Sequence, residues 1–174
     1  MDARSGREAT STQERTTMER TSERELVVTR TIDGPAQIVF DAWTDPALLK
    51  RWWIPRSVPI TLLSVEMDVR TGGTYRFVFQ VDPTTTMAFF GRYLEVSPPS
   101  RLVWTNEEGE GDAVVTTATF DEDQGRTRLV VRDLYPSKDA LDDAIASEAT
   151  PGWAEMLDQL DELLLELDAS SGRA

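Results

Sequence analysis

The alternation of apolar and polar residues divides the first third of the chain into one strand-like segment and two helix-like segments. A β-branched run at Glu25–Ile32 predicts a strand, and it ends in an Asp-Gly-Pro turn that also suits the start of a helix. Apolar residues then recur at helical spacing and predict two short helices over residues 36–43 and 47–53. Asp45, directly before Pro46, is expected to cap the second of these helices.

Period-two alternation dominates the middle of the chain and predicts six further strands. Short sequences rich in Gly, Pro or Asp separate them, too short for the crossovers that parallel strands require. We therefore expect an antiparallel meander. The six predicted strands cover residues 61–70, 74–81, 87–96, 101–107, 113–121 and 127–134.

The C-terminal segment carries the clearest helical pattern. A shorter acidic helix is predicted just before it, over residues 138–146, and Thr150-Pro151 is expected to start the long helix. A long amphipathic helix after an antiparallel meander must bury its apolar side on one face of the sheet, so we predict a two-layer α+β domain. The apolar stripe consists of Trp153, Met156, Leu157, Leu160, Leu163, Leu164 and Leu167.

Both ends of the chain differ in composition from this pattern. Residues 1–23 contain almost nothing to bury and are predicted to be a disordered tail without influence on stability, and residues 169–174 a disordered C-terminus. The folded domain is expected to span residues 24–168. No stretch approaches the roughly 20 apolar residues of a membrane span, and no secretory signal is visible. A cytoplasmic location fits best.

Composition narrows the possible chemistry. The chain contains neither Cys nor His, which excludes disulfides, catalytic triads and metal sites with Cys or His ligands. We expect no metal and no cofactor. The net charge of −13 argues against a nucleic-acid partner, because phosphate contacts need clustered cations. Residues 136–168 hold ten Asp or Glu against one Lys, which is typical of a solvated helix face.

Several short motifs in a fixed order resemble one known family. The segment VTRTIDGPAQIVFDAWTDPALLKRWW is similar to the start of START-like (SRPBCC) proteins, in the branch related to the C-terminal domain of the activator of the ninety-kilodalton heat-shock ATPase. The resemblance runs from about residue 25 to residue 168. Further motifs are Gly-Gly-x-Tyr-x-Phe at 72–77, GRYLEV at 91–96, PPSRL at 98–102, TRL at 127–129, YPSKD at 135–139 and Gly-Trp at 152–153.

This resemblance implies a helix-grip fold, in which a curved antiparallel sheet wraps around the long C-terminal helix and leaves a cavity between them. Relatives include lipid and hormone carriers, polyketide cyclases, stress-response proteins and chaperone regulators. No catalytic set is common to the branch, so the resemblance implies no catalytic residues. The chain departs from the usual pattern at residues 149–151, where many relatives have Gly-Met-Glu, near one end of the expected cavity.

Strand alternation and helix spacing bring large side chains toward the expected cavity. On the strand at 87–96 two pairs compete for the inner face, and we favour Phe89 and Tyr93 over Phe90 and Leu94. Rings on one strand face are usually plain core, whereas Trp, Tyr and Met also line mixed sites. The candidate ligand-binding residues are Trp43, Trp52, Trp53, Tyr75, Phe77, Phe89, Tyr93, Trp104, Asp133, Trp153, Met156 and Leu157.

Asp133 is the polar candidate of greatest interest, because it shares strand parity with Leu129 and Val131. A buried carboxylate could anchor a polar head group or, with a shifted pKa, act as an acid. The other charged residues considered are expected to point outward into water, since burying an unpaired charge is costly. These are Glu66, Asp68, Arg70, Arg92 and Arg132.

Three functions remain open at this stage. The first, which we favour, is binding of a small hydrophobic or amphipathic ligand in the cavity. The second is regulation of a heat-shock ATPase, which is not favoured because the known activator pairs this domain with an N-terminal one and here only 23 polar residues precede it. The third is a cyclase or hydrolase that uses carboxylates and tyrosine. A homodimer is possible, and the fold alone does not decide among these functions.

Overall fold

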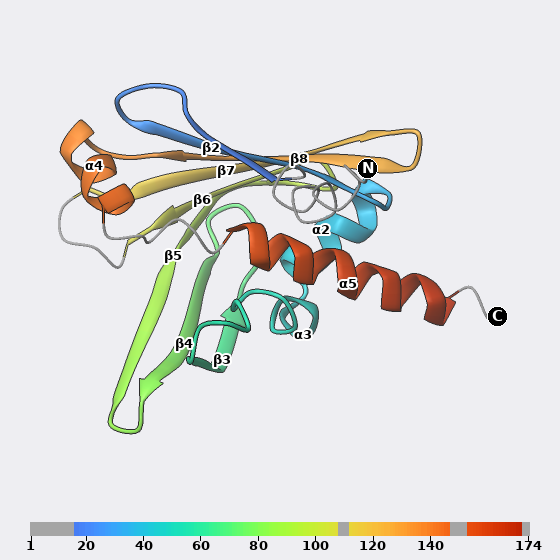
Figure 1. Ribbon diagram of the computed structural model, residues 1–174, viewed down its shortest axis with the longest axis horizontal. Helices are drawn as coiled ribbons and strands as arrows, with labels where there is room; N and C mark the ends of the chain where they lie inside the picture. Colours follow the sequence, from blue (N-terminus) through green and yellow to red (C-terminus); the bar gives the residue numbers. More distant parts are fainter. Residues whose placement is uncertain (1–15, 108–111, 147–152, 172–174) are drawn as a thin grey trace, which may run out of the picture.

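The computed structural model describes residues 16–107, 112–146 and 153–171. An antiparallel sheet and a long helix dominate the described chain (Figure 1). The strands are β1 (Thr16–Arg20), β2 (Glu25–Ile32), β3 (Thr61–Met67), β4 (Thr74–Asp82), β5 (Thr85–Ser97), β6 (Arg101–Asn106), β7 (Val114–Asp123) and β8 (Arg126–Leu134). The helices are α2 (Ala36–Thr44), α3 (Pro46–Leu49), α4 (Lys138–Ala146) and α5 (Trp153–Ser171).

Over the described residues the sheet has eight strands, in the order β1-β2-β8-β7-β6-β5-β4-β3. Every neighbouring pair is antiparallel, and β3 to β8 follow one another as the predicted meander. The first strand of the folded core, β2, closes this meander by pairing with β8 along its whole length, from Glu25 opposite Leu134 to Ile32 opposite Thr127. The predicted α+β helix-grip fold is therefore confirmed.

The sheet bends sharply within β5. The first part of this strand pairs with β4, and the part from Tyr93 onward pairs with β6 across a register shift. At the bend, a Cβ atom on Gly91 would lie 1.9 Å from the Thr105 carbonyl oxygen, so only glycine allows this approach. As a result β4 and the first part of β5 diverge from the plane of β6, β7 and β8 (Figure 1).

The helices α2 and α5 lie on the concave side of the sheet, and the core fills the space between them (Figure 1). Asp45 caps α3 as predicted, because its carboxylate accepts a hydrogen bond from the Ala47 amide at 2.9 Å. The largest fully buried apolar side chains are Trp52, Phe120, Ile32, Leu49, Leu102, Leu129, Leu141, Leu157, Leu160, Val28 and Val39.

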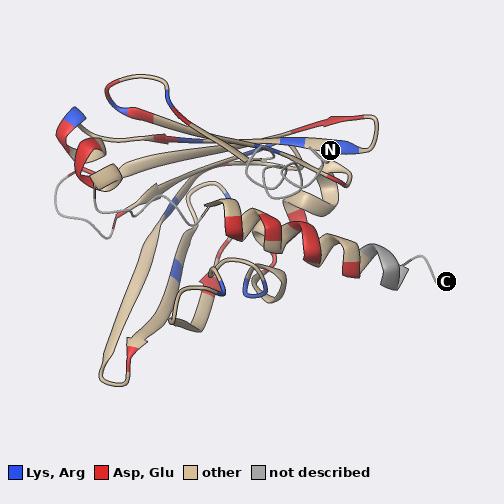
Figure 2. Ribbon diagram, in the orientation of Figure 1, with Lys and Arg blue, Asp and Glu red and all other residues tan. Residues whose placement is uncertain are grey.

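Two buried polar residues attach α5 to its surroundings. Arg30 on β2 is buried and pairs with Asp158, at 2.7 Å, and with Asp161 on the helix. Gln159 is also buried, and its amide donates to the carbonyls of Trp52 and Ile54, at 3.2 and 2.9 Å. These contacts lie along the middle of the helix, where Figure 2 shows acidic residues in red, and they fix its position against the sheet and the loop after α3.

The prediction that residues 1–23 form a disordered tail is wrong for the end of that segment nearest the domain. Residues 16–20 form β1, which pairs with β2, and Thr16 accepts a hydrogen bond from the buried Arg30 side chain at 2.8 Å. The sequence hides this strand because its outer positions are polar and exposed, as an edge strand permits. Residues 1–15 lie outside the described residues.

Other element boundaries also differ from the predictions. The helix α5 continues to Ser171 rather than ending by residue 168, because nothing in its sequence stops it there. The helix α3 ends at Leu49, and the strand β3 ends at Met67. The Thr150-Pro151 start predicted for the long helix lies outside the described residues. No described helix is both long and apolar enough to cross a membrane.

Candidate functional site

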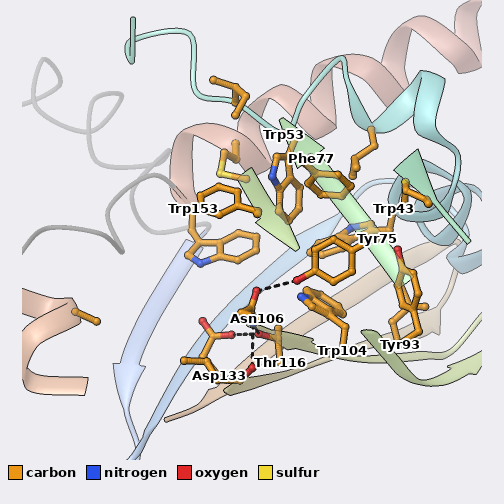
Figure 3. Close-up of a pocket in the computed structure, with 18 of the residues that line it drawn as sticks. Trp43, Trp53, Tyr75, Phe77, Tyr93, Trp104, Asn106, Thr116, Asp133 and Trp153 are labelled. Atoms are coloured by element: carbon orange, nitrogen blue, oxygen red, sulfur yellow. Dashed lines mark hydrogen bonds between the residues drawn. The ribbon is translucent and has the colours of Figure 1, made fainter. Parts of the chain in front are cut away.

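A cavity of about 760 Å³ lies between the concave face of the sheet, the loop after α3 and the first turns of α5. Most of its lining is apolar, with a small set of polar groups (Figure 3). The described lining residues are Trp43, Leu49, Trp53, Ile54, Pro55, Val58, Ile60, Met67, Tyr75, Phe77, Phe89, Tyr93, Leu102, Trp104, Asn106, Asp112, Val114, Thr116, Asp133, Tyr135, Pro136, Ala140, Ala144, Trp153 and Met156.

Three tryptophans from three different elements form one aromatic cluster at the cavity. Trp43 of α2 and Trp153 of α5 stack with ring centroids 6.1 Å apart and an interplanar angle of 19°. Trp53, from the loop after α3, meets both rings edge-on, at 5.9 and 6.1 Å. The cluster joins the helix α5 to the loop and gives the cavity a rigid aromatic side.

Ten of the twelve predicted residues line this cavity, among them Phe89 and Tyr93, whereas Phe90 and Leu94 are exposed. The structure thus places these ten residues at one cavity, and their role in ligand binding stays a prediction. Trp52 and Leu157 do not line it, and both are completely buried in the core. The indole nitrogen of Trp52 already donates a hydrogen bond of 3.0 Å to the Ala42 carbonyl, so it is not available to a ligand.

The polar groups of the cavity form a hydrogen-bonded series across four strands, β8, β7, β6 and β4 (Figure 3). Asp133 on β8 accepts a bond of 2.6 Å from the hydroxyl of Thr116 on β7, its partner in register. That hydroxyl accepts a bond of 2.9 Å from the side-chain amide of Asn106 on β6. The Asn106 carbonyl lies 3.3 Å from the hydroxyl of Tyr75, which also lies 2.7 Å from the Thr105 carbonyl.

Burial changes the acidity of this site. It raises the pKa of Asp133 from its ordinary value to about 6, although the Thr116 hydroxyl opposes the shift by hydrogen-bonding the charged form. Burial and the neighbouring Asp133 charge raise the pKa of Tyr135 to about 12, and burial raises that of Tyr93. Asp133 therefore carries an incompletely solvated negative charge at neutral pH.

One further polar group in the cavity wall has no hydrogen-bond partner in the part of the chain that the structure describes. The indole nitrogen of Trp43 is buried and makes no hydrogen bond to any described residue. A buried donor without an acceptor is costly in free energy, so native proteins seldom retain one without a use for it.

The charged residues predicted to point outward do so. Arg70 pairs with Asp68 at 2.8 Å, and Arg92 pairs with Glu107 at 3.2 Å, on exposed parts of the sheet. Arg132 reaches Glu25 on the outer face, and Glu66 is exposed. None of these residues is among those that line the cavity in the described chain.

Four polar lining residues were missed by the sequence reasoning: Asn106, Asp112, Thr116 and Tyr135. Two of them carried a usable signal. Asn106 shares strand parity with Leu102 and Trp104, and Thr116 shares it with Ala118 and Phe120, so both stand at inward positions among apolar residues. A polar residue at such an inward position is therefore a candidate for lining a cavity, because a buried polar group needs a partner.

The residues that line the cavity are suited to contact with an apolar molecule, and Asp133 can exchange a hydrogen bond or a proton with it. No group of three or more Asp or Glu among the described residues is arranged to hold a metal ion. A curved antiparallel sheet, a gripped helix and an apolar cavity between them define the class of helix-grip, START-like proteins (Figure 1).

Within this class, the chain belongs to the family of Activator of Hsp90 ATPase homolog 1-like proteins, whose model matches residues 33–165. A protein from Rhodobacter sphaeroides is 26% identical, with a TM-score of 0.79 and coverage of 87% of this chain and 99% of that one. A protein from Nitrosomonas europaea is 26% identical, with a TM-score of 0.75 and coverage of 86% and 99%.

A third solved structure, the AHSA1-like protein from Aeromonas hydrophila, is 19% identical and shows the shared fold alone. Its TM-score is 0.63, over 84% of this chain and 94% of that one. Among curated proteins, none matches the sequence.

Proposed function

We propose that the protein binds one small, mostly apolar molecule in the cavity between the sheet and the start of α5. The observation that carries the proposal is the cavity itself, with its volume of about 760 Å³. Small-molecule sites usually occupy roughly 300–1,000 Å³ and combine apolar walls with a few placed polar groups. The aromatic cluster of Trp43, Trp53 and Trp153 and the polar series around Asp133 correspond to these two parts.

Energetics supports the same proposal. Protein interiors are normally packed as densely as organic crystals, so a space of this size between the sheet and the helix is unusual in a plain core. Here the polar groups of Asp133, Thr116 and Asn106 stand on the sheet side of a space that other elements surround (Figure 3). Keeping a carboxylate at such a place costs free energy, which a ligand contact would offset.

Two measurements test the proposal. Native mass spectrometry of freshly purified protein should detect a co-purified small molecule at one copy per chain. Titration of stripped protein with the neutral probe N-phenyl-1-naphthylamine should show one saturable site by fluorescence. Protein that carries no copurified molecule and does not take up the probe would contradict the proposal.

Regulation of a heat-shock ATPase is a second candidate, favoured by the description of the matching family. It is tested by adding the protein at stoichiometric amounts to an Hsp90 ATPase assay. A several-fold rate increase would establish this function, and it would not conflict with ligand binding in the cavity.

A further inference from the structure

We propose that the molecule bound in this cavity is an apolar compound with a protonated amine, and that the amine pairs with the Asp133 carboxylate. This inference rests on the proposed function and adds the chemical class of the ligand. Three observations carry it: the charge of the lining, the bonding of Asp133, and the aromatic rings around it.

The described lining holds two carboxylates, Asp112 and Asp133, and no Lys or Arg. Arg132, next to Asp133 in the chain, is exposed on the other face of β8 and pairs with Glu25. An anionic head group such as a fatty-acid carboxylate would therefore enter a site with negative charge and no described cation. A cation would enter a site that attracts it.

The hydrogen bonds of Asp133 leave room for such a partner. Because Asn106 donates to the Thr116 hydroxyl, that hydroxyl directs its single proton to Asp133. Asp133 thereby receives one hydrogen bond, and no ion pair joins it to any cation in the described chain. An ionised carboxylate has about four acceptor positions, so an ammonium group can donate to those that remain.

Burial makes the same point in terms of free energy. The raised pKa of Asp133, about 6, shows that its negative charge is poorly compensated by the protein. A bound ammonium would supply the missing opposite charge by a charge-assisted hydrogen bond.

Aromatic rings complete the site. In Figure 3 Trp153 lies above Asp133 and Trp53 lies beyond it, while Tyr75 and Trp104 lie to one side of the same space. The faces of such rings attract cations and also pack against apolar groups. An amine anchored at Asp133 can therefore extend its apolar body along these rings.

The test compares three probes with the same chain and different head groups: decylamine, decanol and decanoic acid, each below its micellar concentration. Their affinities are measured at pH 7.5 by displacement of N-phenyl-1-naphthylamine. We expect decylamine to bind at least about tenfold more tightly than decanol, as hydrogen bonds to charged groups allow. Decanoic acid should bind most weakly.

The matched variants are Asp133→Asn and Asp121→Asn, which change the net charge equally. Asp133→Asn should reduce the preference for decylamine over decanol from at least about tenfold to about twofold or less. Asp121→Asn should retain the preference, because Asp121 is exposed on β7 and does not line the cavity. Melting curves of both variants check that they fold.

The outcomes separate this inference from the proposed function. Equal affinity for the three probes, or an unchanged preference in Asp133→Asn, would overturn the amine assignment while the cavity remains a binding site. Failure of the neutral probe itself to bind would overturn both.

Discussion

The two ends of α5 present the same apolar stripe to different surroundings. Toward the C-terminal end, Leu160 and Leu164 are buried against the core, with at most 4% of their surface exposed. At the N-terminal end, Trp153 and Met156 continue the stripe but face the cavity. The helical period specifies which side of the helix turns inward, and it does not specify whether the opposite space is filled.

The difference arises from the elements opposite each end. The middle of α5 is attached by Arg30 and Gln159 to the sheet and to the loop after α3, which brings the Leu160 side into contact with the core. The first turns of α5 face β4 and the first part of β5. Because of the bend at Gly91, these two strands diverge together from β6, β7 and β8 (Figure 1). One end of the helix is therefore packed into the core, and the other borders the cavity.

The largest expected effect on stability is at the C-terminal part of α5, which is packed against the core. Leu164→Ala should lower the free energy of unfolding by about 2–5 kcal/mol, because it leaves a cavity in packed core. Leu165→Ala, on the same helix but 64% exposed, is the matched control and should change it by less than about 0.5 kcal/mol. Urea denaturation measures both, and equal losses would show that this part of the helix is not closed.

The ion pairs of Arg30 give the next largest effect. Arg30→Ala should cost about 2–4 kcal/mol of unfolding free energy, because it leaves Asp158 and Asp161 partly buried without a cation. Arg56→Ala removes an exposed pair to Glu162 on the same helix and should cost less than about 0.5 kcal/mol. A loss of similar size in both variants would mean that burial of Arg30 does not matter.

Replacing Asp133 at the cavity should raise the free energy of unfolding, whereas the two replacements above lower it. Its raised folded-state pKa means that folding favours the protonated acid, so the ionised form reduces stability above pH 6. Asp133→Asn should raise the unfolding free energy by about 1–3 kcal/mol at pH 8, and the gain should disappear by about pH 4. Denaturation series at both pH values measure it. A loss of stability at pH 8 would show that the carboxylate contributes to the fold.

Met156→Ala should have the smallest effect on stability, about 1 kcal/mol or less, because it enlarges a space that already exists. The same change should alter the affinity for N-phenyl-1-naphthylamine, since Met156 lines the cavity. If this variant loses as much stability as Leu164→Ala and binds the probe unchanged, the start of α5 is ordinary core.

Much of the fold could be predicted from the sequence, because period-two and helical patterns mark the inward face of each element. The edge strand β1 was not predicted, because it is mostly exposed and shows no apolar alternation. It forms by pairing with β2 rather than by burying side chains. Element ends were also missed, as at Leu49, where the helix α3 stops although the sequence permits one more turn.

The candidate site could be predicted only in part. Trp52 and Trp53 are adjacent, yet one bonds to Ala42 in the core and the other lines the cavity, and composition does not distinguish them. Asp133 was found by strand parity. The cavity volume could not be foreseen, because it depends on the bend in β5 and on how far the loop after α3 approaches the sheet.

The central claim is that the space at the start of α5 binds a small apolar molecule, and filling that space tests it most directly. Met156→Trp places a larger side chain at the cavity, and Leu165→Trp adds the same side chain on the exposed face of the same helix. Both are titrated with N-phenyl-1-naphthylamine beside the unchanged protein. The account predicts one saturable site in the unchanged protein and in Leu165→Trp, and its loss or strong weakening in Met156→Trp. Equal binding by all three proteins would contradict it.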